Sequence, residues 1–105
     1  MDEKIINQVK RHDRAAFELL YDRVSAPLFA VITRLIDDRQ VAEQVLEQTF
    51  VQIWNLAPAY DSGTGNFFTW MLGIACKNTL EAKNTTERQP AARTLRELFQ
   101  QSAAR

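Results

Sequence analysis

The chain has 105 residues, of which 46% are hydrophobic and 25% are charged, and this composition fits one globular domain with its own core. The one cysteine, Cys76, excludes an internal disulfide and a cysteine-based zinc site. The first residues lack the apolar core of a signal peptide, and no apolar run reaches the roughly 20 residues that a membrane span needs. We therefore expect a cytoplasmic protein without a membrane span.

The formal net charge is zero, but the charges are unevenly distributed along the chain. Residues 1–76 contain seven Lys or Arg and ten Asp or Glu, whereas residues 77–105 contain six and three. A mildly basic second part is a weak electrostatic footprint for a surface that binds nucleic acid.

Three apolar stripes predict helices in the first 36 residues. A short helix over residues 1–11 would turn Ile5, Ile6 and Val9 inward. Asp13 can cap a second helix, and Ser25 can cap a third that has Pro27 in its first turn. Because proline disfavours a helical residue before it, we expect a break or kink near residues 25–27. The stripes after residue 13 consist of Ala16, Phe17, Leu20, Tyr21, Val24, Leu28, Val31, Ile32, Leu35 and Ile36.

A long amphipathic helix follows, with start signals at Asp37 and Asp38 and stop signals at Pro58 and residues 61–63. Its apolar face consists of Ala42, Val45, Leu46, Thr49, Phe50, Ile53, Trp54 and Leu56. Its polar face is rich in amides and consists of Gln40, Glu43, Gln44, Glu47, Gln48, Gln52 and Asn55. Such a face can hydrogen-bond a partner at a low desolvation cost, or it can simply face water.

A short loop over residues 59–66 leads into a cluster of aromatic residues. Gly63 and Gly65 allow the loop backbone conformations that other residues avoid. A helix then begins at Phe67 and continues to about Lys83, with Phe67, Trp70, Met71 and Ile74 on its inner face and Cys76 as a buried, inert thiol. Phe68 and Thr69 would lie nearer the loop. The aromatic residues form either part of the core or a stacking platform for unstacked bases.

The C-terminal part of the chain reads as a linker and a last short helix. Residues 84–86 are a plausible helix stop, and Pro90 would begin a helix with Ala92, Leu95, Leu98 and Phe99 on one side. That stripe either packs back on the bundle or forms a binding patch. Few glycines and prolines favour an all-α fold, a compact bundle of about four to five helices. We divide the chain into a helical domain, residues 1–88, and a linker with a short amphipathic helix, residues 89–105.

No set of residues indicates catalysis. His12 has no second His or Cys for a metal site, so a solvent-facing or cap-assisting role is expected. The glycines at positions 63 and 65 are not followed by the Lys and Ser or Thr of a phosphate-binding loop. We therefore expect a protein that is not an enzyme and that needs no cofactor or metal.

Three segments in order resemble the second region of bacterial RNA polymerase sigma factors of the extracytoplasmic-function type. They are AAFELLYDRVSAPLFAVITRLI, AEQVLEQTF and FFTWMLGIA, and the resemblance covers about residues 13–80. It implies a compact helical domain whose long helix docks on the clamp helices of core RNA polymerase. It also implies that the loop and the next helix capture the non-template single strand of the minus-ten promoter element during promoter opening.

The resemblance assigns candidate residues to both partners. The polymerase-binding residues would be Gln40, Glu43, Gln44, Glu47, Gln48 and Gln52. The DNA-binding residues would be Asp61, Ser62, Asn66, Phe68, Thr69, Lys77, Asn78 and Lys83.

The chain departs from the family pattern at three points. Gln44 and Gln48 stand where acidic residues are usual, and Gly73 stands where Arg is frequent. Lys77 takes the place of the usual Asn, and the basic run that follows is diluted by acidic residues. The helix-turn-helix region that reads the minus-thirty-five element is absent. The chain is thus a piece of a longer protein or a stand-alone domain, and Met1 favours a natural N-terminus.

Two other functions stay open. A degenerate sigma-like module that has lost DNA reading would act as a decoy or bind an anti-sigma protein. An unrelated helical bundle is the third interpretation.

Overall fold

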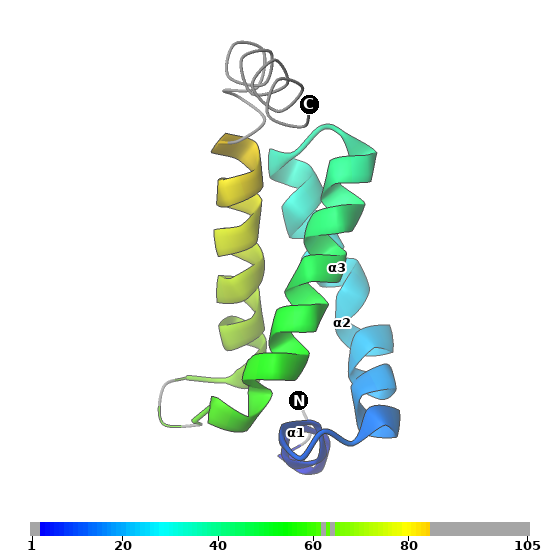
Figure 1. Ribbon diagram of the computed structural model, residues 1–105, viewed down its shortest axis with the longest axis vertical. Coiled ribbons are helices and arrows are strands. Elements are labelled where there is room, and N and C mark those ends of the chain that lie inside the picture. The colour runs from blue at the N-terminus through cyan, green and yellow to red at the C-terminus, as the bar shows by residue number, and fades with distance from the viewer. Residues whose placement is uncertain (1–2, 62, 64, 85–105) are drawn as a thin grey trace, which may run out of the picture.

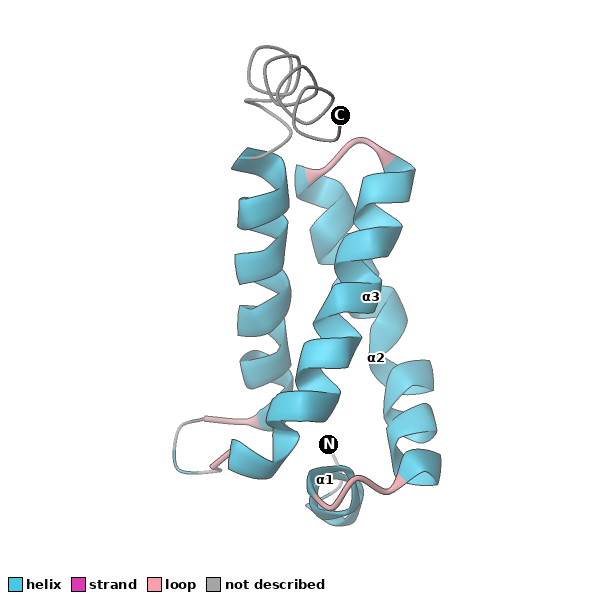
Figure 2. Ribbon diagram, in the orientation of Figure 1, coloured by secondary structure: helices cyan, strands magenta, loops and turns pink. Residues whose placement is uncertain are grey.

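The structure is a computed structural model that describes residues 3–61, 63 and 65–84. The described residues contain helices α1 (Glu3–Lys10), α2 (Arg14–Leu35) and α3 (Arg39–Leu56), the 3-10 turn η1 (Ala57–Ala59), and a further helix over residues 67–84. The three long helices lie side by side, and α1 crosses one end of the bundle (Figures 1 and 2). No strand occurs in this part of the chain. The predicted all-α bundle is confirmed.

Two predicted aspartate caps begin the long helices. Asp13 Oδ1 accepts a hydrogen bond from the backbone N–H of Ala16 at 3.1 Å, at the start of α2. Asp38 Oδ1 accepts from the N–H groups of Gln40 and Val41 at 2.9 and 3.3 Å, at the start of α3. Each carboxylate satisfies backbone donors that have no partner within the helix.

Of the break or kink expected near residues 25–27, the break is wrong, because α2 runs through this segment with Pro27 inside it. Proline removes one backbone hydrogen bond from the helix interior. The buried side chains of Val24 and Leu28, only 3% and 0% exposed, hold both sides of that position in the core. Ser25 is therefore a helix-interior residue and not a cap.

The core lies between the three long helices and extends to α1. Leu20, Leu28, Ile32, Ile53, Phe67 and Met71 are fully buried there. The predicted stripes supply most of it, but three of their residues are exposed, Tyr21 at 43%, Leu35 at 40% and Leu56 at 48%. Cys76 was expected to be buried, but it is only half-buried. None of the described helices is long and apolar enough to cross a membrane.

His12 joins α1 to the bundle. Its backbone has a φ of 62°, a left-handed conformation that reverses the chain between α1 and α2. Its exposed ring stacks on Trp54 with 4.6 Å between ring centroids, and Nε2 lies 3.0 Å from the Trp54 carbonyl oxygen. The residue thus faces solvent, as expected, and also fixes the end of α3. Residues 85 and 86 of the predicted helix stop, and the whole of the last helix predicted from Pro90, lie outside the described residues.

Candidate functional site

The outer face of α3 presents a polar surface, which we call the α3 face. Its residues are Gln40, Glu43, Gln44, Glu47 and Gln48, all exposed. The ion pair found on it joins Arg39 Nε to Glu43 Oε2 at 3.4 Å, with side chains 78% and 56% exposed. An exposed pair of this kind contributes little to stability. The face thus presents three uncharged amides, which donate and accept hydrogen bonds, and two carboxylates, which accept them.

Gln52, at the edge of the α3 face, belongs to a buried network that ties α3 to the 67–84 helix. Asn78 Nδ2 donates to Gln52 Oε1 at 3.2 Å and to Thr49 Oγ1 at 3.1 Å. Thr49 Oγ1 in turn donates to the Val45 carbonyl oxygen at 2.7 Å. Buried polar groups that are fully hydrogen-bonded stabilise one arrangement of the two helices.

Asn78 is only 3% exposed, and this burial corrects its assignment to the DNA-binding residues. Successive residues on a helix point about 100° apart. Lys77 is exposed, and the next side chain along the helix therefore turns inward to α3. The amide nitrogen of Asn78 donates its hydrogen bonds to Thr49 and Gln52 of α3, so we remove this residue from the candidate DNA surface.

The loop before the 67–84 helix is held by its own hydrogen bonds. The Tyr60 hydroxyl donates to the Gly65 carbonyl oxygen, and Gly65 has a φ of 125°, which strongly favours glycine. Asp61 Oδ1 accepts from the Gly63 N–H at 3.0 Å, and Asn66 Oδ1 accepts from the Thr69 N–H at 2.8 Å. Asn66 thus caps the helix. Ser62 lies outside the described residues.

The aromatic cluster divides between core and surface. Phe67 is 1% exposed, stacks on Trp70 at 5.3 Å between centroids, and meets Tyr60 edge-on at 4.9 Å. Phe67 is therefore a core residue. Phe68 packs against the core but stays half-exposed, so it is the aromatic residue at the start of the helix that fits a stacking role best.

The candidate cations come from two elements. On the 67–84 helix, Lys77 is exposed and Lys83 is half-buried, at the end of the helix away from the loop. Lys10 of α1 places Nζ 5.7 Å from the centre of the Tyr60 ring, next to the loop. Sequence reasoning missed Lys10, because only the crossing of α1 under the bundle brings it there (Figure 1).

Comparison with protein families gives a match over most of the chain. The model of the family Sigma-70 region 2 matches residues 20–88, well over half of the chain. The chain belongs to the sigma-70 region 2 family. This confirms the resemblance inferred from the three sequence segments, and family membership confirms that the protein is not an enzyme.

The curated relatives that match the chain include sigma factors of mycobacteria. The chain is 28% identical over 79 residues to the "ECF RNA polymerase sigma factor SigK" of Mycolicibacterium vanbaalenii. The aligned residues make up 75% of this chain and 40% of that protein. It is 24% identical over 79 residues to the protein of that name from Mycobacterium tuberculosis (strain ATCC 25177 / H37Ra). Here the aligned residues make up 75% of this chain and 42% of that protein. The chain thus spans about two fifths of the length of these curated relatives. No solved structure matches it.

The region 2 match includes both candidate surfaces. It begins within α2, at Leu20, and runs through α3, the loop and the 67–84 helix. Helix α1, with Lys10, precedes the matched residues. The assignment of individual residues to polymerase or DNA stays a prediction, as do the domain boundaries at residues 88 and 89.

Proposed function

We propose that the chain is the core-binding and minus-ten-recognition domain of an extracytoplasmic-function type sigma factor and acts in the cytoplasm. The α3 face docks on the clamp helices of core RNA polymerase. The loop and the start of the 67–84 helix receive the non-template single strand and contribute to promoter opening. Family membership and the exposure of the α3 face together support this role.

The α3 face is the observation that carries the proposal. Its exposed side chains lie on one helix, α3, whose opposite side buries Ala42, Val45, Thr49, Phe50 and Ile53 in the core. A partner that covers carboxamides removes them from water at a lower cost than it would remove charges. Sites on rigid elements also lose little conformational entropy on binding.

Binding to core RNA polymerase tests the proposal. We expect the fluorescently labelled chain to bind purified core enzyme saturably, and we expect an unlabelled full-length sigma factor to displace it. Displacement follows because both proteins would occupy the same clamp surface. Binding that a full-length sigma factor leaves intact would place the chain elsewhere on the polymerase.

The DNA surface of the proposal has few cations. It comprises Asp61, Ser62, Asn66, Phe68, Thr69, Lys77 and Lys83, to which we add Lys10. Extruding a base costs a few kcal/mol, and stacking it on an aromatic ring returns about 1–3 kcal/mol. We expect the isolated chain to bind single-stranded DNA with a dissociation constant of roughly 10⁻⁴ to 10⁻⁶ M and a steep dependence on salt. Salt-insensitive nanomolar binding to duplex DNA would contradict this.

Gly73 allows a gain-of-function test of the DNA surface. The residue is exposed in the helix, and a Cβ placed there would meet no atom within 4 Å. Gly73→Ala should stabilise the helix by about 1 kcal/mol. Gly73→Arg should in addition tighten single-stranded DNA binding roughly three- to tenfold at low salt and steepen the salt dependence by about one ion. Fluorescence anisotropy with a mixed-sequence oligonucleotide measures both variants, and equal affinities for Ala and Arg would argue against DNA at this face.

A second candidate function is a protein-interaction module, a decoy or a target of an anti-sigma protein, without DNA reading. The absence of a side chain at Gly73 and the inward turn of Asn78 favour it. The double change Lys77→Glu/Lys83→Glu separates the two candidates, with thermal unfolding as a check on folding. Loss of promoter-opening activity in the assembled enzyme supports the sigma function. If the double variant binds its protein partner as the wild type does and promoter opening does not change, the result supports the interaction module.

A further inference from the structure

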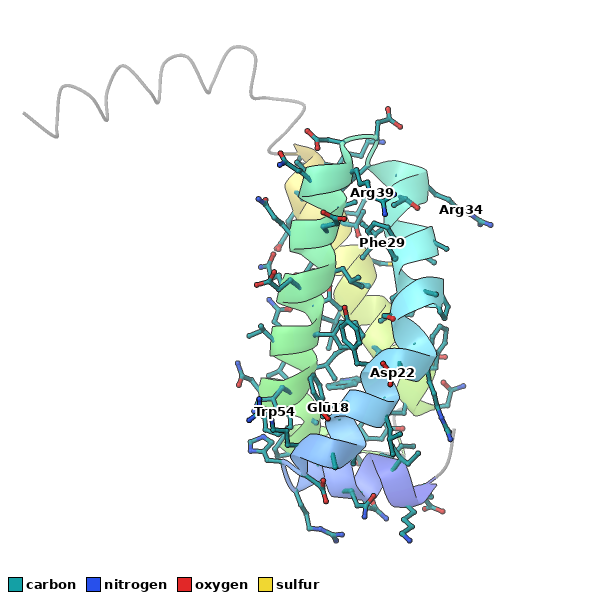
Figure 3. All side chains as sticks on the ribbon, turned by 90° about the vertical axis from the view of Figure 1, so that its right-hand side faces the viewer. Glu18, Asp22, Phe29, Arg34, Arg39 and Trp54 are labelled. Carbon is teal, nitrogen blue, oxygen red and sulfur yellow. The ribbon has the colours of Figure 1, made fainter. Side chains whose placement is uncertain are left out.

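An open groove of about 790 Å³ runs along the outside of the bundle between α2 and α3. Its apolar wall and floor include Phe17, Tyr21 and Phe29 from α2 and Leu46, Val51 and Trp54 from α3. Figure 3 views this side of the molecule, with Trp54 near one end of the groove and Phe29 toward the other. Two of the lining side chains, Val51 at 54% and Tyr21 at 43% exposed, are left largely uncovered by the described residues.

The floor of the groove is built from interlocked rings. Phe17 meets Trp54 edge-on at 5.0 Å and Phe50 at 6.0 Å, and Tyr21 contacts Phe50 at 4.6 Å between centroids. Each ring pair of this kind contributes about 0.5–1.5 kcal/mol beyond its buried area, which favours this arrangement of the floor. A concave site of this volume with a mainly apolar lining can receive the apolar side chains of a partner segment.

The rim of the groove is acidic. Glu18 and Asp22 lie beside it on α2, and Glu43 and Glu47 line it from α3. Two cations lie among these four carboxylates. Arg14 lines the groove, and Arg39 lies 5.5 Å from the centre of the Phe29 ring and pairs with Glu43, so the rim keeps a net negative charge. The charge of the rim therefore selects a segment that carries apolar side chains together with arginines.

The chain contains such a segment beyond the described residues. Leu98 and Phe99 follow Leu95 by three and four residues, the spacing of the anchor residues with which an amphipathic helix enters an apolar groove. Arg93 and Arg96 accompany them, and residues 85–105 contain four arginines against two glutamates. We propose that residues 90–101 of the chain itself dock in the α2–α3 groove.

The connection is long enough for this placement. The helix that ends at residue 84 does so beside the α2–α3 connection (Figure 1). Residues 85–89 span up to about 17 Å when extended. Neighbouring helix axes lie about 8–10 Å apart. The linker can therefore pass over the end of α3 and enter the groove near Glu43.

Docking would regulate the α3 face. Glu43 and Glu47 line the groove and also belong to the α3 face, so the docked segment would compete with core polymerase; this consequence rests on the proposed function. Docking itself needs no polymerase. A test on the isolated chain therefore separates failure of the docking from failure of the sigma function.

Disulfide trapping in the full-length chain tests the docking. In a Cys76→Ser background, the pair Val51→Cys with Leu98→Cys probes the groove. The pair Leu80→Cys with Leu98→Cys is the matched control, because Leu80 is also exposed, at 53%, and lies closer to residue 98 in sequence. If residue 98 were only tethered by the chain and not docked, the control pair would form its disulfide faster, because fewer residues separate its two cysteines. Docking should make the groove pair form an intramolecular disulfide roughly tenfold faster, through a higher effective concentration.

Non-reducing gels and peptide mass spectrometry at low micromolar protein give the rates. A faster groove pair that Arg93→Glu/Arg96→Glu slows would support docking guided by the acidic rim. Equal rates, or a faster control pair, would overturn the proposal. Disulfide-linked dimers as the main product would also overturn it, because the occupant would then be a second copy. Circular dichroism of the reduced variants checks that the fold is intact.

Discussion

Phe67→Ala is expected to lower the free energy of unfolding by about 3–5 kcal/mol. The side chain is 1% exposed and lies between Tyr60 and Trp70, at the point where the loop enters the 67–84 helix. Truncation removes a large buried surface and leaves a cavity between rings. A domain of this size has a total stability of roughly 5–15 kcal/mol, so the variant would lose a large part of it.

Phe68→Ala is the matched control for this prediction. Phe68 is half-exposed, so its truncation should cost clearly less stability, while it should weaken single-stranded DNA binding more. Urea unfolding followed by circular dichroism measures the first effect, and fluorescence anisotropy measures the second. A stable Phe67→Ala variant that has lost DNA binding would assign the stacking role to Phe67 and contradict the core interpretation.

Gln44→Arg/Gln48→Arg is expected to weaken binding to core RNA polymerase by about 2 kcal/mol or more, which is roughly 30-fold. Both glutamines are exposed on the α3 face, so the fold tolerates the change. Two arginines would replace amides at the centre of the proposed contact, and their charges would have to be desolvated there. A pull-down followed by titration of the labelled chain measures the loss.

The double change Asn7→Arg/Asn84→Arg adds the same charge away from the α3 face. Asn7 is exposed on α1, and Asn84 is exposed at the end of the described chain. This control should bind the polymerase like the wild type. An equal loss in both double variants would indicate a general charge effect and would leave the α3 face without a specific role.

Local signals made much of the helical architecture predictable. The aspartate caps at Asp13 and Asp38 and the apolar spacing fixed where α2 and α3 begin and which faces they bury. Pro27 misled the sequence reasoning, because the local preference against proline is weaker here than the packing of Val24 and Leu28. Tertiary contacts of this kind are absent from a local pattern.

The candidate site was predictable only in part for the same reason. The α3 face follows from helical periodicity, and its residues are exposed as expected. The inward turn of Asn78 depends on where Thr49 and Gln52 lie on another helix, and the approach of Lys10 to Tyr60 depends on how α1 packs. These contacts join residues far apart in sequence, so no spacing rule within one segment identifies them.

The central claim is that α3 docks on core RNA polymerase, and photo-crosslinking from position 48 tests it most directly. A photoreactive amino acid replaces Gln48 in one variant and Asn7 in another, and each is irradiated with core enzyme. The proposed docking predicts a crosslink from position 48 to the polymerase clamp helices and none from position 7. A properly folded variant that gives no crosslink from position 48, or the same crosslinks from both positions, would contradict docking through the α3 face.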